Sequence, residues 1–284
     1  MARKQSGTGL SPAMTRIGKL IGAAALAAGS VAAAITTASP AAASAASFCD
    51  ELGAQWDGHS CHTSVTSDRK AVRDIKMALP GDLVENPVIR QYLTNLMNNW
   101  RNAAQKMAAD SFGEEQFEIF QHGDAMTAVF HEMYSGTVGT DALSHPNAPI
   151  VSDAYRTFTF AGGRQLQLAD LFKPGVDHRT EIPRLGEPFI VAALDAAPPP
   201  HQPGTYPFTP DRWTPDNVYS GGYKAWALTP DELILYMPDY PVGRDSPIDF
   251  TPARMQWAMD GGTVQARIPL SALAPVLQPQ FGGA

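Results

Sequence analysis

Three polar residues are the strongest candidates for chemistry in this chain of 284 residues. Ser144 stands next to His145, and Ser135 lies nine residues before Ser144. A serine hydrolyses esters when a histidine removes its proton and a carboxylate orients the imidazole. If the chain is an esterase, His145 is the base, Ser144 or Ser135 is the nucleophile, and Asp141 or Asp153 is the orienting carboxylate.

Other patterns weaken the case for catalysis. The chain has no Gly-x-Ser-x-Gly segment, which would mark a nucleophile between a strand and a helix. Ser135 and Ser220 stand beside glycines and are typical of turns. His131 alternates within an expected strand, which favours a partly buried structural histidine. No His-Glu-x-x-His segment and no glycine-rich phosphate loop occurs, so the sequence predicts neither a metal nor a cofactor.

The first 43 residues have the features of a secretory signal peptide. Basic residues come first, residues 20–35 are apolar and uncharged, and small residues suited to cleavage follow at Ala41, Ala43 and Ala45. Sixteen apolar residues are few for a membrane span, so an uncleaved helix is the weaker alternative. Without an Arg-Arg pair, the general secretory route is expected. The mature protein, residues 44–284, is then a single secreted or envelope-associated domain without a membrane anchor.

Charge excludes some partners. The signal segment carries four basic residues and no acidic one, so its removal takes the formal charge from −7 to −11. An acidic protein of this kind is not expected to bind nucleic acid or an anionic membrane surface. An unknown envelope or host ligand is the expected partner.

The only two cysteines, Cys49 and Cys61, follow the signal segment closely. In an exported chain this spacing predicts a disulfide that fixes the new N-terminus to the domain. Because His59 and His62 flank Cys61, a metal site is the alternative, but oxidation would consume the thiolates that zinc needs.

The helices and strands that would position a functional site are arranged around one long helix. Asn86 and Pro87 form a helix start, and apolar residues then recur at helical spacing through about residue 109. Strands are expected within 61–79, in two runs of 114–135, at 155–168 with a hairpin at Gly162-Gly163, and at 223–228, 233–237 and 264–268. Short helices are expected at 169–172, 189–197 and 270–277. The pattern predicts an α+β fold with an antiparallel or mixed sheet packed on the long helix.

Residues 197–217 form a proline-rich insertion. Seven prolines in this stretch favour extended, solvated backbone. Loops of this length are usually functional or disordered, and we expect disorder here.

Four segments in order carry a resemblance to a known family. They are Cys49-Asp50-Glu51-Leu52 with Cys61, and residues 168–172, 228–236 and 264–273. Together they cover most of residues 48–278, and in them the chain resembles the mycobacterial secreted immunogenic antigens. It also resembles the RsiV-like extracellular domain of lysozyme-sensing anti-sigma factors. The resemblance implies a β-grasp-like fold and an exported protein.

The chain departs from these relatives in two loops. Relatives often carry Gly-Gly-x-His before the central hairpin, whereas Ser144-His145-Pro146 keeps only the histidine. The loop after Tyr236 is also unlike theirs, so lysozyme binding is not expected. Two hypotheses follow: an exported binding or antigen-like protein without chemistry, which the sequence favours, and a secreted short-chain carboxylesterase, which some relatives are regarded as being.

Overall fold

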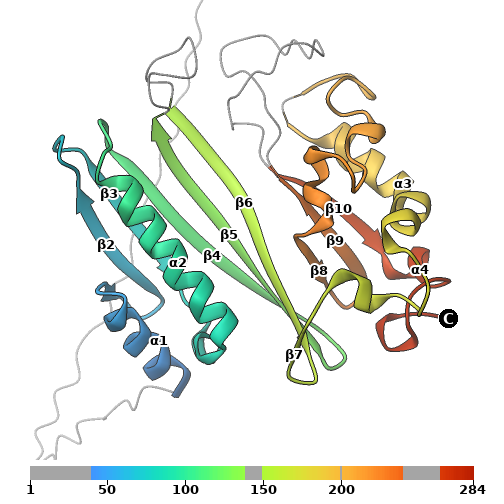
Figure 1. The fold of residues 1–284 in the computed structure, drawn as a ribbon, viewed down its shortest axis with the longest axis horizontal. Coiled ribbons are helices and arrows are strands. Elements are labelled where there is room, and N and C mark those ends of the chain that lie inside the picture. Colours follow the sequence, from blue (N-terminus) through green and yellow to red (C-terminus); the bar gives the residue numbers. More distant parts are fainter. Residues whose placement is uncertain (1–39, 138–148, 199, 239–262) are drawn as a thin grey trace, which may run out of the picture. The chain divides into compact units, whose positions relative to one another are not determined.

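Seven strands, taken in chain order, form one large sheet. The computed structural model describes residues 40–137, 149–198, 200–238 and 263–284 (Figure 1). β3 and β4 are parallel because helix α2 connects them, and every other neighbouring pair is antiparallel. The strands are β1 (Gln55–Trp56), β2 (Ser60–Thr66), β3 (Val72–Ala78), β4 (Ser111–His122), β5 (Ala125–Thr137), β6 (Pro149–Ala161) and β7 (Arg164–Leu166).

Helix α2 (Pro87–Ala104) is the expected long helix. The Asn86 side chain accepts hydrogen bonds from the N–H groups of Val88 and Ile89, which caps the first turn. One face of the helix is buried against the sheet, as the helical spacing predicted; its buried residues are Ile89, Leu93, Leu96, Met97, Trp100 and Ala104. The helix ends five residues before the predicted end at residue 109, so its last predicted turn is absent.

Helix α1 (Pro40–Glu51) is joined to β2 by the predicted disulfide between Cys49 and Cys61, so these thiols are not available to a metal. The predicted signal boundary after residue 43 falls inside this helix. The buried part of α1 begins at Ala45 and includes Phe48.

The hairpin between β6 and β7 confirms the Gly162-Gly163 prediction. Both glycines have positive φ, 55° and 77°, as a two-residue turn requires. The short helix expected after it is the 3-10 turn η2 (Leu168–Leu171).

A separate three-stranded antiparallel sheet follows, which the sequence did not distinguish from the first. It is ordered β10-β9-β8 and consists of β8 (Trp226–Leu228), β9 (Glu232–Met237) and β10 (Val264–Pro269). Helices α3 (His178–Ala196) and α4 (Leu270–Leu273) pack against it. The remaining short 3-10 turns are η1 (Gly81–Glu85), η3 (Pro210–Arg212), η4 (Val218–Tyr223) and η5 (Pro279–Phe281).

Helix α3 begins eleven residues earlier than the sequence predicted. Pro183 and Pro188 lie inside it, and proline in a helix interior normally argues against a helix. Tertiary packing outweighs that cost here, because Gly186 lets the helix approach β10 closely. A Cβ at Gly186 would lie 2.7 Å from the Cδ1 atom of Ile268.

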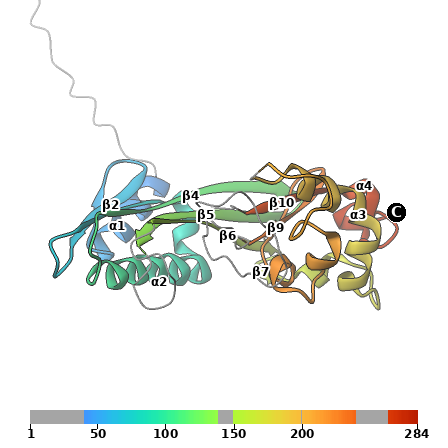
Figure 2. The ribbon, with the colours of Figure 1, turned by 90° about the horizontal axis from the view of Figure 1, so that it is seen from above.

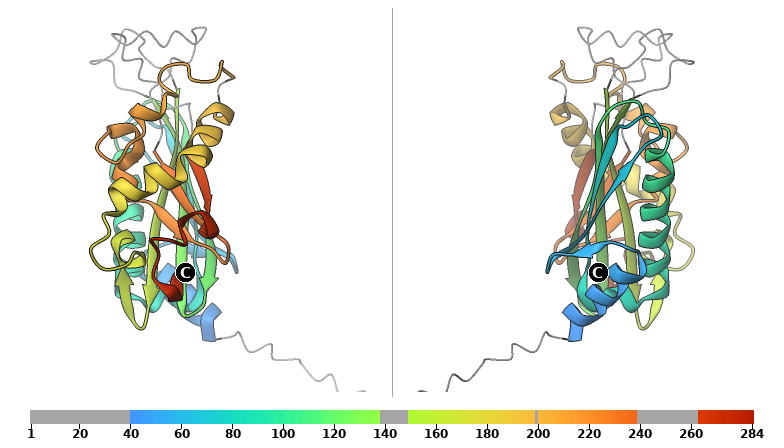
Figure 3. Two further views of the ribbon diagram at one scale, coloured as in Figure 1. Left: turned by 90° about the vertical axis from the view of Figure 1, so that its right-hand side faces the viewer. Right: turned by 90° about the vertical axis from the view of Figure 1, so that its left-hand side faces the viewer.

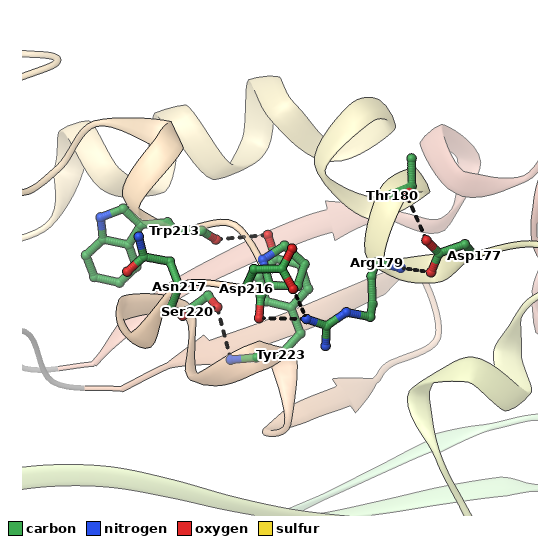
Figure 4. A network of polar contacts seen from close by, with 10 residues as sticks. Asp177, Arg179, Thr180, Trp213, Asp216, Asn217, Ser220 and Tyr223 are labelled. Carbon is green, nitrogen blue, oxygen red and sulfur yellow. Dashed lines mark hydrogen bonds and ion pairs between the residues drawn. The ribbon is translucent and has the colours of Figure 1, made fainter.

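The expectation of disorder at 197–217 is wrong for the residues that the structure describes there. Phe208 and Trp213 are buried, and the indole N–H of Trp213 donates to the Pro207 carbonyl at 2.8 Å. Arg179 of α3 holds the far end of the segment: its guanidinium donates to the Pro215 carbonyl at 3.1 Å and pairs with Asp216 (Figure 4). Aromatic side chains, rather than proline content, decide the order of this segment.

Helix α2 and the three-stranded sheet lie on opposite faces of the large sheet (Figure 3). Phe130 of β5 is buried under α2, whereas its neighbour Val129 packs with Ile234 of β9. The N-terminal helices lie over one end of the large sheet, and α3 and α4 lie beside the other end (Figure 2). The structure thus confirms the predicted α+β fold class and the predicted long helix. None of the described helices is long and apolar enough to span a bilayer.

Candidate functional site

The predicted serine site is only partly within the described residues. Ser144, His145 and Asp141 lie outside them. Ser135 is near the end of β5, where its hydroxyl accepts the Phe112 N–H at 3.1 Å and its carbonyl accepts from Arg73 at 3.1 Å. These bonds hold β4, β3 and β5 together, so Ser135 has a structural role in the strand pairing.

Ser220 has the turn role that the sequence favoured. Its buried hydroxyl donates to the Asn217 carbonyl at 2.9 Å and accepts the Gly222 N–H at 3.0 Å (Figure 4). Nearby, the Tyr223 hydroxyl donates to the Trp213 carbonyl at 3.0 Å. This cluster stabilises η4 and leaves Ser220 without a histidine partner among these hydrogen bonds.

A histidine–aspartate pair lies instead on the central strands. Antiparallel pairing places His131 of β5 opposite Tyr155 of β6, and Met133 opposite Asp153, so His131 and Asp153 are diagonal neighbours on one face. The Nε2 atom of His131 contacts the Oδ1 atom of Asp153 directly. Both side chains are about a quarter exposed, at 25% and 29%. The pair is therefore accessible and was not recognised from the sequence.

Asp153 is fixed from a second direction by the start of β10. Its other carboxylate oxygen accepts the Thr263 N–H at 3.0 Å, and its carbonyl accepts the Thr263 hydroxyl at 2.7 Å. Burial alone would raise the pKa of Asp153. The hydrogen bonds from His131 and Thr263, with the charge of His131, outweigh burial and hold that pKa below its ordinary value. Asp153 is thus an ionised group that orients the imidazole.

Three rings are stacked beside this pair. The His131 ring lies 4.3 Å from the Tyr155 ring at an interplanar angle of 8°. Tyr155 in turn lies 4.5 Å from Tyr236 of β9 at 19°. The Gln265 amide donates to the Tyr155 hydroxyl at 3.0 Å. The stack therefore joins both sheets.

These residues line a pocket of about 180 Å³, here called the inter-sheet pocket. Its walls come from β4 and β5 on one side and from β9 and β10 on the other. The lining residues are Gln116, Phe117, Glu118, Val129, His131, Tyr155, Tyr236, Gln265 and Arg267. They combine aromatic rings, amides, a carboxylate and a guanidinium, and the polar members of this set can bind polar ligands through hydrogen bonds.

The tyrosines of the pocket are neutral hydrogen-bonding groups near pH 7. Burial, with the charges of Asp153 and Glu118, raises the pKa of Tyr155 to about 12. Burial and Glu118 also raise the pKa of Tyr236. Arg267 is paired with Glu232 at 3.0 Å at the rim.

A nucleophile is missing from this arrangement. Among the described residues that line the inter-sheet pocket, none is serine, threonine or cysteine. Ser135 shares the face of His131, but four residues along a strand separate them by about 13 Å. That distance is far beyond the reach of a hydrogen bond. The described geometry therefore supplies a base and its orienting carboxylate, and it supports binding more directly than acyl transfer.

A second pocket, here called the open-face pocket, has a volume of about 190 Å³. It is lined by His59, Ser60, Lys76, Ala78, Glu114, Glu115, Gln116 and Phe117. Within the described part of the chain, no three His, Cys, Asp or Glu residues are grouped to hold a metal.

Sequence patterns contained a signal for the histidine–aspartate pair. His131 lies on one strand, and Asp153 and Tyr155 lie two residues apart on the next, so Asp153 and Tyr155 share a face of that strand. Only the register of β5 with β6 brings them together, however, and the eleven residues between the two strands in the sequence do not determine that register.

Comparisons with known proteins give partial matches. The family described as "Protein of unknown function (DUF3298)" matches residues 169–271, which include Tyr236, Gln265 and Arg267 of the inter-sheet pocket. The family described as "Mannan-binding protein" matches residues 38–75. Among solved structures, a DUF3298 family protein from Pseudomonas aeruginosa PAO1 has 12% identity and a TM-score of 0.46, covering 79% of this chain and 94% of that one. No curated protein matches the chain.

The protein is thus of the α+β class, and its residues 169–271 are similar to the DUF3298 family. None of the matches reported above names a mycobacterial antigen.

Proposed function

We propose that this protein is an exported binding protein of the cell envelope or extracellular space, with its ligand in the inter-sheet pocket. One observation carries the proposal. A stack of His131, Tyr155 and Tyr236 borders a pocket whose lining also offers the polar side chains of Gln116, Glu118, Gln265 and Arg267, and none of its described lining residues is serine, threonine or cysteine. The antigen-like assignment from the sequence resemblance belongs to this proposal.

Export is supported by the signal-like first 43 residues and by the disulfide between Cys49 and Cys61. A disulfide is stable in oxidising compartments outside the cytoplasm. We also propose that export uses the general secretory route and that the signal peptide is cleaved after about residue 43.

We propose a carbohydrate as the ligand class. Sugar hydroxyls donate and accept hydrogen bonds, as do the amides of Gln116 and Gln265 and the hydroxyl of Tyr155. The match to the mannan-binding family points the same way, and it includes His59 and Ser60 of the open-face pocket. Mannose-type sugars are therefore the first ligands to test.

The test is calorimetric titration of the mature protein, residues 44–284, with mannose and soluble mannose oligomers. Binding is expected, and Glu118→Gln should weaken it at least tenfold because Glu118 is an exposed acceptor at the pocket. Arg164→Ala is the matched control, since Arg164 is exposed on the β6–β7 hairpin and lines neither described pocket. Absence of binding by the wild-type protein, or an equal loss in both variants, would reject the proposal.

A secreted short-chain esterase is the second candidate, and the His131–Asp153 pair favours it. A histidine held by an ionised aspartate is the base–orienter part of a hydrolase site. The site proposed from the sequence is His145 with Ser144 or Ser135. The two candidate bases, His131 and His145, can be distinguished by mutation. Loss of a general base costs about 100-fold or more in rate.

A fluorophosphonate probe with a heat-denatured control tests for an activated serine. If ester hydrolysis is found, His145→Ala should abolish it in the sequence-based site and His131→Ala in the structural one. If the folded protein is neither labelled by the probe nor hydrolyses esters, the esterase candidate is rejected and only the proposed binding function remains.

A further inference from the structure

We propose that the inter-sheet pocket and the open-face pocket are two parts of one groove along β4, which binds a chain of several sugar units. The inference rests on the proposed carbohydrate-binding function and extends it from a single site to a polymer. Gln116 and Phe117 line both pockets, so the two lie next to each other along β4.

Strand geometry places the polar residues of both pockets on one face. Side chains of a strand alternate between faces, so Glu114, Gln116 and Glu118 point to the same side of β4. Register pairs Glu114 with Lys76 of β3, and pairs Gln116 with His131 of β5. These residues therefore form one row from β3 across β4 to β5.

This row is on the face of the sheet away from α2. Ile75 and Met77, the sequence neighbours of Lys76, are buried with α2 in one core, as is Phe130, the neighbour of His131. The three-stranded sheet covers only part of the opposite face, where Val129 and Tyr155 pack with β9. Lys76 and Gln116 are exposed, so the groove continues from beneath β9 and β10 onto open sheet.

The size of the groove favours a chain over a single small molecule. Each pocket is smaller than the roughly 300–1,000 Å³ of a site that encloses a drug-sized ligand. Glu114 and Glu118 are four residues apart on a strand, which is about 13 Å. One sugar ring does not reach from one to the other, whereas a linear oligosaccharide does.

The charges of the groove favour a neutral polyhydroxylated chain. Lys76 and Arg267 supply cationic donors near its two ends, and Glu114 and Glu118 supply acceptors between them. The Gln116 amide donates to Glu114 at 2.9 Å and keeps its carbonyl oxygen for a ligand. The groove carries both positive and negative side chains, and the mature protein is strongly acidic, so a polyanionic ligand is disfavoured. The charged and amide side chains of the groove do not form the apolar pockets that bind the anchor residues of a peptide.

The Ser60 hydroxyl in the wall of the open-face pocket adds an independent observation. Ser60 is fully buried, and its Oγ atom has no hydrogen-bond partner among the described residues. Buried hydroxyls are nearly always paired. A ligand hydroxyl at this end of the groove would give Ser60 the partner that the protein does not.

The experiment is a chain-length series. Mannose and linear mannose oligomers of increasing length are titrated calorimetrically into the mature wild-type protein and two variants of the open-face pocket, Lys76→Ala and Glu114→Gln. Ser64→Ala is the control, because Ser64 is exposed on the neighbouring strand β2 and lines neither pocket. Thermal unfolding of each variant checks that the fold is intact.

Affinity is expected to rise with chain length and then level off once the chain spans both pockets. Lys76→Ala and Glu114→Gln should weaken the long oligomers about tenfold and leave mannose unchanged, with Ser64→Ala like wild type. Equal affinity for short and long chains, or equal losses for both in the two variants, would overturn the groove while leaving the proposed function standing. Absence of any binding would reject both.

Discussion

Glu115 is a buried carboxyl group beneath helix α2 and is only 1% exposed. Neither of its carboxyl oxygens has a hydrogen-bond partner among the described residues. Glu132, directly opposite on β5, accepts the Tyr92 hydroxyl at 3.0 Å and pairs with Arg156 at 3.5 Å. Burial first, and the charge of Glu132 second, raise the pKa of Glu115 well above its ordinary value. Glu115 therefore favours its neutral form in the folded protein.

This shift predicts a pH dependence of stability. The folded protein keeps a proton on Glu115 at pH values where the unfolded chain, with a pKa of about 4.3, has lost it. The stabilisation is complete below that pH and is lost as the pH rises through the raised pKa. Over this window the free energy of unfolding should fall by about 1.4 kcal/mol per pH unit.

Glu115→Gln removes the titrating group, so it should remove the contribution of Glu115 to the fall of the unfolding free energy with pH. The measurement is urea unfolding from pH 4 to pH 8, and the variant should gain stability relative to wild type as the pH rises. Glu114→Gln is the control, because Glu114 is partly exposed on the opposite face of the same strand. Parallel stability curves for Glu115→Gln and wild type would contradict the prediction.

At the scale of single elements, helix α2 contributes five buried side chains to the core against the large sheet. Leu96 is 7% exposed on its inner face, whereas Val88 in its first turn is 37% exposed. Leu96→Ala should lower the free energy of unfolding by about 2–5 kcal/mol, the cost of a cavity in a core. Val88→Ala should change it far less. The measurement is the urea midpoint of each variant, and an unchanged midpoint for Leu96→Ala would show that this side of α2 does not carry the core.

The disulfide adds a local constraint between α1 and β2. It closes a loop of twelve residues, which corresponds to about 3 kcal/mol at most. The variant with both Cys49→Ala and Cys61→Ala should lose up to that amount, and reduction of the wild-type protein should lose a similar amount. Mass spectrometry of an unreduced digest should show the linked peptides. Two free thiols in protein recovered from the medium would contradict the pairing.

Elements with strong local signals were predictable from the sequence, and elements fixed by distant contacts were not. Asn86, Pro87 and the apolar spacing after them predicted α2, and Gly162-Gly163 predicted the β6–β7 turn. The start of α3 was missed because the packing of Gly186 on Ile268, which outweighs two prolines, has no local signature. The order of residues 200–217 likewise depends on burial of Phe208 and Trp213 under distant segments.

The candidate site was less predictable than the fold. Its groups come from β4, β5, β6, β9 and β10, which are brought together by sheet register and by packing of one sheet on the other. A strand position alone does not show what lies across from His131, so the sequence favours a structural role for this residue. The Ser144–His145 prediction lies outside the described residues and stays a prediction.

At the scale of the whole molecule, threonine hydroxyls join the two sheets. The hydroxyl of Thr127 on β5 contacts the Thr159 hydroxyl at 3.0 Å and accepts the Leu228 N–H of β8 at 3.3 Å. The Thr157 hydroxyl accepts the Trp226 N–H at 2.9 Å. Thr127 is fully buried, so the bonds of its hydroxyl are shielded from water. Polar contacts, as well as apolar packing, thus set the position of β8 on the large sheet.

Thr127→Val tests the contribution of these bonds. Valine has nearly the shape of threonine and is more apolar, so apolar packing alone predicts an unchanged or higher stability. Loss of the hydroxyl leaves the Leu228 N–H and the Thr159 hydroxyl without a partner, which costs about 1–3 kcal/mol. Thr127→Ser keeps the hydroxyl and loses one methyl group, which costs about 0.8 kcal/mol. We therefore expect valine to destabilise the protein more than serine does.

The measurement is urea unfolding of both variants, followed by tryptophan fluorescence and by far-ultraviolet circular dichroism. Trp226 lies in the smaller sheet, whereas Trp56 and Trp100 lie in β1 and α2, so the fluorescence is read in a background that carries Trp56→Phe and Trp100→Phe. Circular dichroism follows the backbone of both sheets. If the sheets unfold as one cooperative unit, the two signals will have the same midpoint in wild type. A valine variant that weakens the junction should lower this midpoint and separate the two signals. A valine variant as stable as wild type would show that apolar packing alone holds the sheets together.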